Sequence, residues 1–386
     1  MSAVLHAEPQ CNPLGGGATT VDWDRLAGGL VLSPGGAGQS ITRLRPLRLN
    51  RLLHGQAADQ LPGLLAAIFA LCGHAHRHTA RLAIAAARGF KATPGAQDMM
   101  ALRAQTAREH VRRILMEWPL PAAADRAAAA KALSSCPLLC ESDMAASLQH
   151  LPRWLERYVL AMPPQEWLRE LGKGGERWLA LWCEQTLTPA AAALGAAREH
   201  SQRLVVPAIP LRLHGNTAMQ QKLASALASH DADADIESRI ALLVNKGRDT
   251  GPWARERDGD RIRYDNAWMR MASRLDDLVR LSLPGAEGAA WLCSGSAVTG
   301  PAEGLAWTEM ARGLLVHWVR LQDDRVAQCQ VLAPTDWNFH PEGPLAAAVA
   351  SLPGDYTGAE DARLMAAAFD PCVPVRLQLQ EVLSHA

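Results

Sequence analysis

The stretch GLLVHWVR at residues 313–320, followed by VAQCQVL at residues 326–332, carries the clearest strand pattern in the chain. Both runs are rich in apolar and β-branched residues, which favour extended structure. A polar segment, Gln322-Asp323-Asp324-Arg325, separates them and is of the length that connects two paired strands. The sequence therefore predicts a β-hairpin over residues 313–332.

Outside this hairpin the dominant pattern is helical. Apolar residues recur at helical spacing in residues 41–87, 96–117, 153–187, 261–282, 345–352 and 361–369. Residues 1–40 are rich in Gly, Pro and Ser, which predicts a loop-rich N-terminal segment with a short strand at residues 29–32. We expect residues 41–386 to form a single domain that is mainly α with a small β component (α+β).

Composition excludes several classes of partner. Lys plus Arg and Asp plus Glu both number 39, so the formal charge is zero and gives no attraction for nucleic acid or anionic lipid. No run approaches the roughly 18 apolar residues that a membrane helix needs, and the N-terminus does not resemble a secretion signal. Eight cysteines are too scattered for a disulfide framework, so we expect reduced thiols and a cytoplasmic protein without membrane insertion.

Five short motifs stand out along the chain, in this order: RLAGGL at 25–30, CGHAHRHT at 72–79, GPWAR at 251–255, TEMARGLLVH at 308–317 with APTDWN at 333–338, and DPCVPVRLQ at 370–378. The last of these resembles Asp-Pro-Cys-x-x-Cys-x-x-His, the C-terminal signature of nickel-iron hydrogenase large subunits. The second resembles the Cys-Gly-x-Cys-x-x-x-His signature of the same proteins. In each, the first cysteine is present and the second is absent.

The other motifs resemble the same family. TEMARGLLVH and APTDWN are similar to its Glu-x-Pro-Arg-Gly-x-x-x-His and Pro-Thr-x-Trp-Asn patterns, and GPWAR is similar to Gly-Pro-Leu-Ala-Arg. Since the motifs span nearly the whole chain but the ligand set is incomplete, the chain most resembles the large-subunit-like maturation proteins called HupK or HoxV. The resemblance implies a reduced large-subunit-like fold and a role in assembly, with no enzymatic activity.

The resemblance also implies what each motif residue does. Cys72 and Cys372 stand at the positions of terminal nickel ligands, whereas Ala75 and Val375 stand where the family has cysteines that bridge nickel and iron. A dinuclear centre depends on bridging thiolates, so no nickel and no hydrogen turnover are expected. Ala27 also replaces the family's proton-transferring glutamate, and an alanine methyl group transfers no proton.

Arg312, Pro334 and Thr335 stand where the family contacts the cyanide ligands of the iron. A guanidinium and a hydroxyl both donate hydrogen bonds to an anionic iron-cyanide group. The resemblance thus implies a hydrogenase formation protein that transiently holds Fe(CN)2(CO). Its implied partners are a small maturation chaperone and the apo large subunit that receives the iron.

Two other functions stay open at this point. The chain could be a metal-free interaction protein that positions the chaperone, or a divergent catalytic hydrogenase subunit, which would require bound nickel. Instead of binding metal, Cys72 and Cys372 could simply be small buried apolar residues. Instead of lining a site, Arg312 could form an ordinary surface ion pair with Glu309.

The remaining polar clusters give weaker signals. His74, His76 and His78 alternate, so a helix would spread them over different faces, whereas an extended segment would bring them together as nickel or zinc ligands. Cys136 and Cys140 lack the second ligand pair of a zinc ribbon. The pairs Asp276-Asp277 and Asp323-Asp324 are expected to lie in a solvated helix and a turn.

Overall fold

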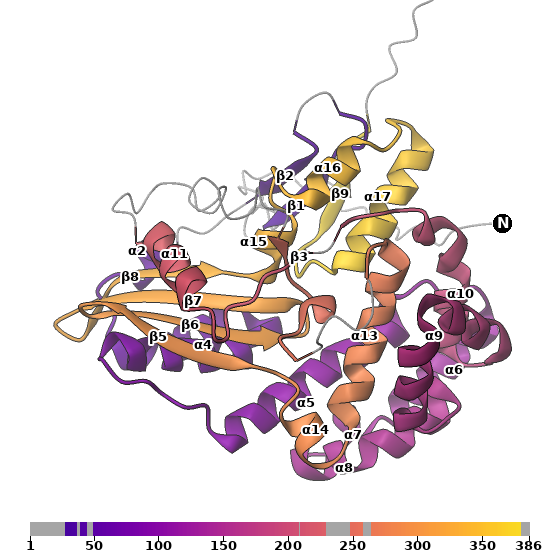
Figure 1. Ribbon diagram of the computed structural model, residues 1–386, viewed down its shortest axis with the longest axis horizontal. Helices are drawn as coiled ribbons and strands as arrows, with labels where there is room; N and C mark the ends of the chain where they lie inside the picture. The colour runs from indigo at the N-terminus through magenta and orange to yellow at the C-terminus, as the bar shows by residue number, and fades with distance from the viewer. Residues whose placement is uncertain are drawn as a thin grey trace, which may run out of the picture.

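The computed structural model describes residues 28–36, 39–44, 49–207, 209–228, 248–257 and 264–379. Residues 25–27 of the RLAGGL motif, including Ala27, lie outside the described residues, as does most of the predicted loop-rich segment. Within the described part, a larger four-stranded sheet, a smaller three-stranded sheet and a set of helices form three connected parts (Figure 1). Two further strands of two residues each pair in parallel as a separate sheet.

The larger sheet is an antiparallel meander in the order β5-β6-β7-β8. Its strands are β5 (Ser294–Gly300), β6 (Glu303–Met310), β7 (Gly313–Gln322) and β8 (Arg325–Leu332). The predicted hairpin is confirmed as β7 and β8, and the polar segment forms its turn. The sequence prediction missed β5 and β6, which precede this hairpin and complete the sheet.

Both faces of this sheet are covered. Helix α4 (Gly73–Ala87) packs along β5, β6 and β7, and a β-carbon at Gly304 would lie only 2.1 Å from the Ala83 carbonyl oxygen. Helix α11 (Thr217–Leu227) covers the other face, where Leu223 and Leu227 pack in one apolar cluster with Trp318. Because most of β7 is buried on both faces, its residues are apolar without alternation.

A helical part lies beside the sheet, to its right and below it in Figure 1. It is built from α5 (Ala96–Arg112), η3 (Arg113–Glu117), α6 (Ala123–Ser134), α7 (Pro137–Cys140), α8 (Met144–Leu155), η4 (Glu156–Leu160), α9 (Pro164–Gln185), α10 (Pro189–Gln202), α13 (Ala267–Ser282), α14 (Gly285–Ala289) and α17 (Tyr356–Phe369). The tryptophans of α9 pack as expected for a core, with Trp167 in edge contact with Trp178 and Trp182.

Helix α13 is the axis of the helical part, since α5, α8, α9, α10 and α17 all contact it. Of its 16 residues only Arg280 is not fully buried. The helix predicted at residues 261–282 is confirmed, although it begins at Ala267. Helices on every side leave α13 without a solvated face, and its charged side chains lie inside the protein.

The smaller sheet joins the two ends of the chain. Strand β1 (Gly29–Leu32) pairs antiparallel with β2 (Ile41–Leu44) and parallel with β9 (Val375–Leu377). The strand predicted at residues 29–32 is confirmed, whereas residues 41–44 are a strand and not the start of a helical region. This pairing places the N-terminal part directly beside the DPCVPVRLQ motif.

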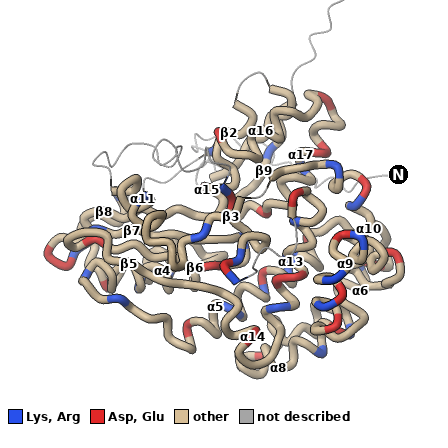
Figure 2. Tube along the Cα trace, in the orientation of Figure 1, with Lys and Arg blue, Asp and Glu red and all other residues tan. Residues whose placement is uncertain are grey.

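The remaining elements are short and mostly connect these parts. They are α2 (Leu49–Leu53), η1 (Ala58–Gln60), α3 (Leu61–Ile68), η2 (Ala70–Cys72), β3 (Ile209–Pro210), β4 (Arg248–Asp249), η5 (Pro252–Ala254), α15 (Pro334–Asn338) and α16 (Pro344–Ala350). Across the described trace, charged residues of both signs are interspersed (Figure 2). No helix in the described ranges has the length and apolar character needed to cross a membrane.

Candidate functional site

Four residues predicted from separate motifs meet in one place. Cys72 ends η2 just before α4, Arg312 lies in the turn between β6 and β7, Thr335 is in α15, and Cys372 follows α17. The Thr335 hydroxyl oxygen lies 3.3 Å from the Cys372 sulfur. Cys72 is close enough to Cys372 and Arg312 for both to influence the pKa of its thiol. The fold thus brings the two halves of the predicted site together.

Two of these residues, Arg312 and Cys372, line a pocket of about 520 Å³. It is lined by Leu71, Glu109, Arg112, Arg113, Glu117, Arg312, Arg363, Ala366, Ala367, Pro371, Cys372, Val373, Pro374, Val375 and Leu377. Four of the lining residues are arginines and two are glutamates. The wall of the pocket therefore favours an anionic occupant.

Cys72 lies at the predicted break between two helices, α3 and α4. Gly73 has an ordinary helical φ of −57°, so the turn does not require a glycine conformation. A β-carbon there would lie 2.7 Å from the Ala66 carbonyl oxygen, so the reason for glycine is the close approach of α3. Burial, and to a smaller extent Cys372, raises the pKa of Cys72 to about 12 although Arg312 lowers it. Cys72 is therefore a neutral thiol that must lose a proton to bind a metal.

Arg312 is held by a tight turn. Gly313, which follows it, has a φ of 130°, and a β-carbon there would lie 2.6 Å from the Thr250 hydroxyl oxygen. Both the conformation and the space require glycine at this position. The Arg-Gly pair in the motif thus serves to present the guanidinium at the pocket.

The guanidinium of Arg312 is buried and only partly satisfied. Its Nη1 lies 3.6 Å from Glu109 Oε2 and its Nε lies 3.7 Å from Asp370 Oδ2. Neither nitrogen has a hydrogen-bond partner among the described residues. The alternative of a surface ion pair with Glu309 is wrong, because Glu309 is buried and accepts hydrogen bonds from the backbone N–H groups of Cys293 and Glu256. Unpaired donors at a pocket fit an anionic acceptor.

Asp370, the first residue of the C-terminal motif, is surrounded by guanidinium groups. It caps α17 in a left-handed conformation and forms ion pairs with Arg113, Arg274 and Arg312. Burial, together with Arg113 and Arg312, holds the pKa of Arg274 well below its usual value. Asp370 thereby orients the arginines around the pocket.

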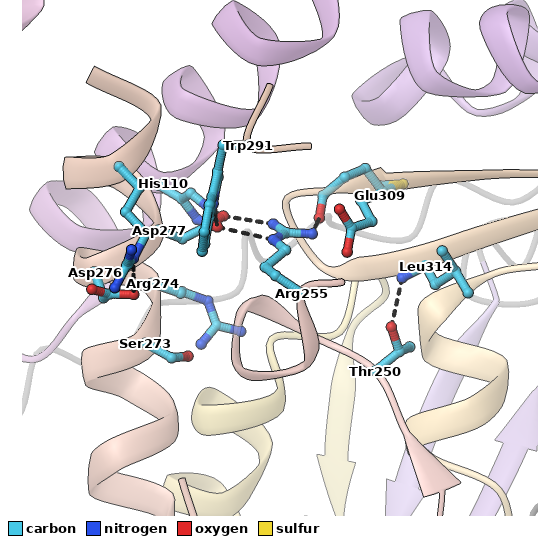
Figure 3. Close-up of polar contacts among 12 residues, drawn as sticks. His110, Thr250, Arg255, Ser273, Arg274, Asp276, Asp277, Trp291, Glu309 and Leu314 are labelled. Atoms are coloured by element: carbon cyan, nitrogen blue, oxygen red, sulfur yellow. Dashed lines mark hydrogen bonds and ion pairs between the residues drawn. The ribbon is translucent and has the colours of Figure 1, made fainter. Parts of the chain in front are cut away.

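A second, fully buried polar cluster fixes the GPWAR motif (Figure 3). Arg255 donates two hydrogen bonds to Asp277, at 2.9 and 2.5 Å, and the Trp291 indole donates another at 2.6 Å. His110 Nε2 lies 2.7 Å from the same carboxylate. Burial alone would raise the pKa of Asp277, but Arg255 outweighs it and holds that pKa far below its usual range. The expectation that Asp276 and Asp277 are solvated is wrong, because α13 is enclosed by helices.

A third contact joins three motifs. The Asn338 side chain accepts a hydrogen bond from the Thr250 N–H at 3.0 Å and donates one to the Thr250 carbonyl at 2.7 Å. The Thr250 hydroxyl accepts a hydrogen bond from the Leu314 N–H at 2.7 Å, as Figure 3 shows. The GPWAR loop, the Arg312 turn and α15 are thus held in fixed relation, and Pro334 begins α15 directly before Thr335.

Comparison with known proteins agrees with this arrangement of motifs. Hydrogenase expression/formation protein HoxV of Cupriavidus necator is 36% identical over 383 residues, which cover 93% of this chain and 97% of that protein. The chain belongs to the HoxV/HupK family of hydrogenase expression/formation proteins. A HupK protein of Rhizobium leguminosarum bv. viciae is 28% identical over 364 residues, covering 87% of this chain and 91% of that protein. The predicted family is confirmed.

Two further comparisons concern hydrogenases. Residues 270–374 match the family described as nickel-dependent hydrogenase. A NiFeSe hydrogenase structure from Desulfovibrio vulgaris Hildenborough aligns with a TM-score of 0.49 and 13% identity, over 86% of this chain and 92% of that chain. The predicted fold class, mainly α with a small β component, is confirmed by the elements described above.

In this HoxV/HupK family protein, the three alternating histidines, His74, His76 and His78, do not come together at one site. They lie on the helix α4, where His76 faces β7 and lies 3.1 Å from His317. His78 lies 3.1 Å from the Ser294 hydroxyl, and His74 lies 3.2 Å from the Asp98 carbonyl. Among the residues that the structure describes, no group of three or more His, Cys, Asp or Glu side chains could hold a metal ion. The alternating histidines therefore do not form the nickel or zinc site that was one of their alternatives.

The two positions without bridging cysteines lie at the same site. Ala75 is buried one turn after Cys72 on α4, and Val375 lines the pocket at the start of β9. The structure thus has two thiols and no bridging pair at the site. Sequence reasoning missed Glu109, Arg113 and Arg274, which lie outside the five motifs. It also assigned no role to Asp370, although Asp370 begins the DPCVPVRLQ motif.

Proposed function

We propose that this protein is a non-catalytic scaffold that holds Fe(CN)2(CO) before the iron passes to an apo hydrogenase large subunit. The observation that carries the proposal is the convergence of Cys72, Cys372, Arg312 and Thr335 beside one arginine-lined pocket. Membership of a family of hydrogenase expression/formation proteins supports the assembly role. The hydrogen-bond donors of Arg312 and Thr335 support an iron centre with anionic ligands as the cargo.

Cyanide ligands on iron are anionic acceptors, and Arg312 has two buried nitrogens without hydrogen-bond partners. Thr335 adds a hydroxyl, which lies 3.3 Å from the Cys372 sulfur. Two charge-assisted hydrogen bonds contribute about 3–6 kcal/mol, which alone gives binding between millimolar and tens of micromolar. Longer retention therefore requires a thiolate bond from Cys372 or Cys72 to the iron.

Release is as important to a scaffold as retention. Ala75 and Val375 remove the thiolates that would bridge a second metal, so nickel has no shared ligand with which to close a dinuclear centre. Two terminal thiols can hold one iron and give it up to a site with more ligands. In this scheme the iron arrives from a small maturation chaperone in the cytoplasm and leaves to the apo large subunit.

Infrared spectroscopy with metal analysis tests the proposal. Protein purified without air from its own host should contain iron without nickel and show cyanide and carbonyl stretches. Arg312→Met should lose most of these bands, because it removes the donors and keeps the apolar length of the side chain. Arg320→Met is a matched control, since Arg320 lies on the same hairpin, pairs with Glu303 and does not line the pocket.

The same experiment separates the alternatives. Absence of the bands, with co-purifying chaperone retained, would favour a metal-free protein that positions the chaperone. Bound nickel together with hydrogen oxidation would instead indicate a divergent catalytic subunit. Equal loss of iron from the Arg312 and Arg320 variants would remove the role proposed for Arg312.

A further inference from the structure

Arg113 occupies an unusual place beside the pocket. Helix α5 ends at Arg112, and the next five residues, Arg113–Glu117, form a π-helix. Wide turns of this kind often occur at functional sites, because they redirect a side chain from the course of the α-helix. The Arg113 side chain lines the pocket and is 18% exposed.

Arg113 and Arg312 bind the two oxygens of one carboxylate. Arg113 Nη2 pairs with Asp370 Oδ1, while Arg312 Nε lies 3.7 Å from Asp370 Oδ2. The two oxygens of a carboxylate are close together, so the two guanidinium groups lie side by side. In Arg113 the Nε is buried and has no hydrogen-bond partner among the described residues, as is true of two nitrogens of Arg312.

The negative groups at this wall are fewer than the positive ones. Glu117 pairs with Arg113, and Glu109 lies near Arg312. Behind them Arg274 is completely buried and also pairs with Asp370. Since Arg113, Arg274 and Arg312 share a single buried carboxylate, an anion entering the pocket would reduce their mutual repulsion.

We infer that Arg113 is a second anion-holding residue, which donates hydrogen bonds to one anionic ligand of the cargo while Arg312 holds another. This inference rests on the proposed function. It makes the preferred cargo a metal centre with two anionic diatomic ligands, because two guanidinium groups lie side by side at the wall. Glu117, whose side chain is 49% exposed, is the counter-ion that such a cargo displaces from Arg113.

Four variants test this assignment in the holoprotein purified without air, with iron retention during gel filtration and the two cyanide stretches as readouts. Arg113→Met should lose iron about 10- to 100-fold faster, the loss expected for one charge-assisted hydrogen bond. It should also shift one cyanide stretch and leave the other in place, which a purely structural defect would not do. Arg113→Lys keeps the charge and should fall between this variant and the wild type.

Glu117→Gln should act in the opposite direction and slow iron loss, because it frees Arg113 from its competing carboxylate without touching Asp370. Arg81→Met is the control, since Arg81 is an exposed arginine near Asp98 and does not line this pocket. Normal loading of the Arg113→Met protein with both stretches unshifted would overturn the inference alone. A wild-type protein without any cyanide or carbonyl bands would overturn the proposed function as well.

If Arg113→Met fails to fold, as circular dichroism would show, Glu117→Gln decides the question. Faster iron loss or no change in that variant would then contradict the inference. Slower loss with one shifted cyanide stretch would support it.

Discussion

Thr335 and Cys372 are 37 positions apart in the sequence, and the hydroxyl oxygen of one lies 3.3 Å from the sulfur of the other. One belongs to the APTDWN motif after the larger sheet, and the other belongs to the DPCVPVRLQ motif, which includes β9. Their contact places a hydrogen-bonding hydroxyl beside a partly exposed thiol at the rim of the arginine-lined pocket. Binding of the iron should therefore change the reactivity of the Cys372 thiol.

Replacing Cys372 with serine should abolish iron retention, because it removes the accessible thiol at the pocket while changing little volume. Cys140→Ser is the matched control, since Cys140 is exposed on α7 and does not line the pocket. Thiol alkylation read by mass spectrometry checks the same point: loaded wild-type protein should protect Cys372 and leave Cys140 reactive. Equal labelling of both thiols in loaded protein would contradict a bond between Cys372 and iron.

Restoring the missing cysteines should convert a temporary holder into a permanent one. The double variant Ala75→Cys with Val375→Cys adds two thiols at the site, which should slow iron release and lower hydrogenase maturation in the host. Iron content after dialysis and hydrogenase activity of the cells measure the two effects. Unchanged release would mean that the lost bridging positions do not control it.

Glu309 should make the free energy of unfolding depend on pH. Burial raises the pKa of Glu309 to about 7 despite nearby Arg255, whereas in the unfolded chain it is about 4.3. Between these values the folded state holds a proton that the unfolded state has lost, so the free energy of unfolding falls as pH rises through the window, by up to about 4 kcal/mol. In Glu309→Gln, urea unfolding at pH 4.5 and pH 7.5 should show a smaller difference. Glu303→Gln, a partly exposed position, should behave like the wild type.

Asp277→Asn should destabilise the protein by about 3–5 kcal/mol, because it leaves the buried Arg255 without its counter-ion. Because the pKa of Asp277 is low in the folded protein, its ionised carboxylate contributes fully to the free energy of unfolding above the ordinary Asp pKa of about 4. This contribution is lost as pH falls below that value. Chemical unfolding measures the loss. Asp59→Asn removes an exposed Asp–Arg pair with Arg88 and should cost less than about 1 kcal/mol. Similar losses of stability in both variants would mean that the buried Arg255–Asp277 pair stabilises the protein no more than an exposed pair does.

Motifs located the ligand-like residues well, since the cysteines, Arg312 and Thr335 stand in short recognisable patterns. Spacing alone could not show that these patterns meet, because the contacts join segments hundreds of residues apart, such as Thr79 and Thr308. Arg113 and Arg274 were missed for another reason. A charged residue on a helix usually faces solvent, and only the packing of other elements around η3 and α13 encloses these two side chains.

The same limit explains the errors in the fold. Strand β5 has the sequence SGSAVTG, whose small residues give no period of two, and β6 is buried on both faces. The N-terminal strand was found, but its parallel partner β9 lies more than 340 residues away and has only three residues. The Asp276-Asp277 pair of helix α13 was expected to be solvated. Both residues are buried instead: Asp277 pairs with Arg255 of another segment, and Asp276 pairs with Arg280 of the same helix.

The polar contacts that fix the fold and the groups that face the pocket are different residues. Arg255, Glu309 and Asn338 join the motifs to one another, and none of them lines the pocket. Changes at positions such as Ala75 and Val375 therefore leave the hydrogen-bonded skeleton intact. The residues that face the pocket can therefore be exchanged one at a time while the contacts that hold the fold together stay in place, so this architecture separates its chemistry from its stability.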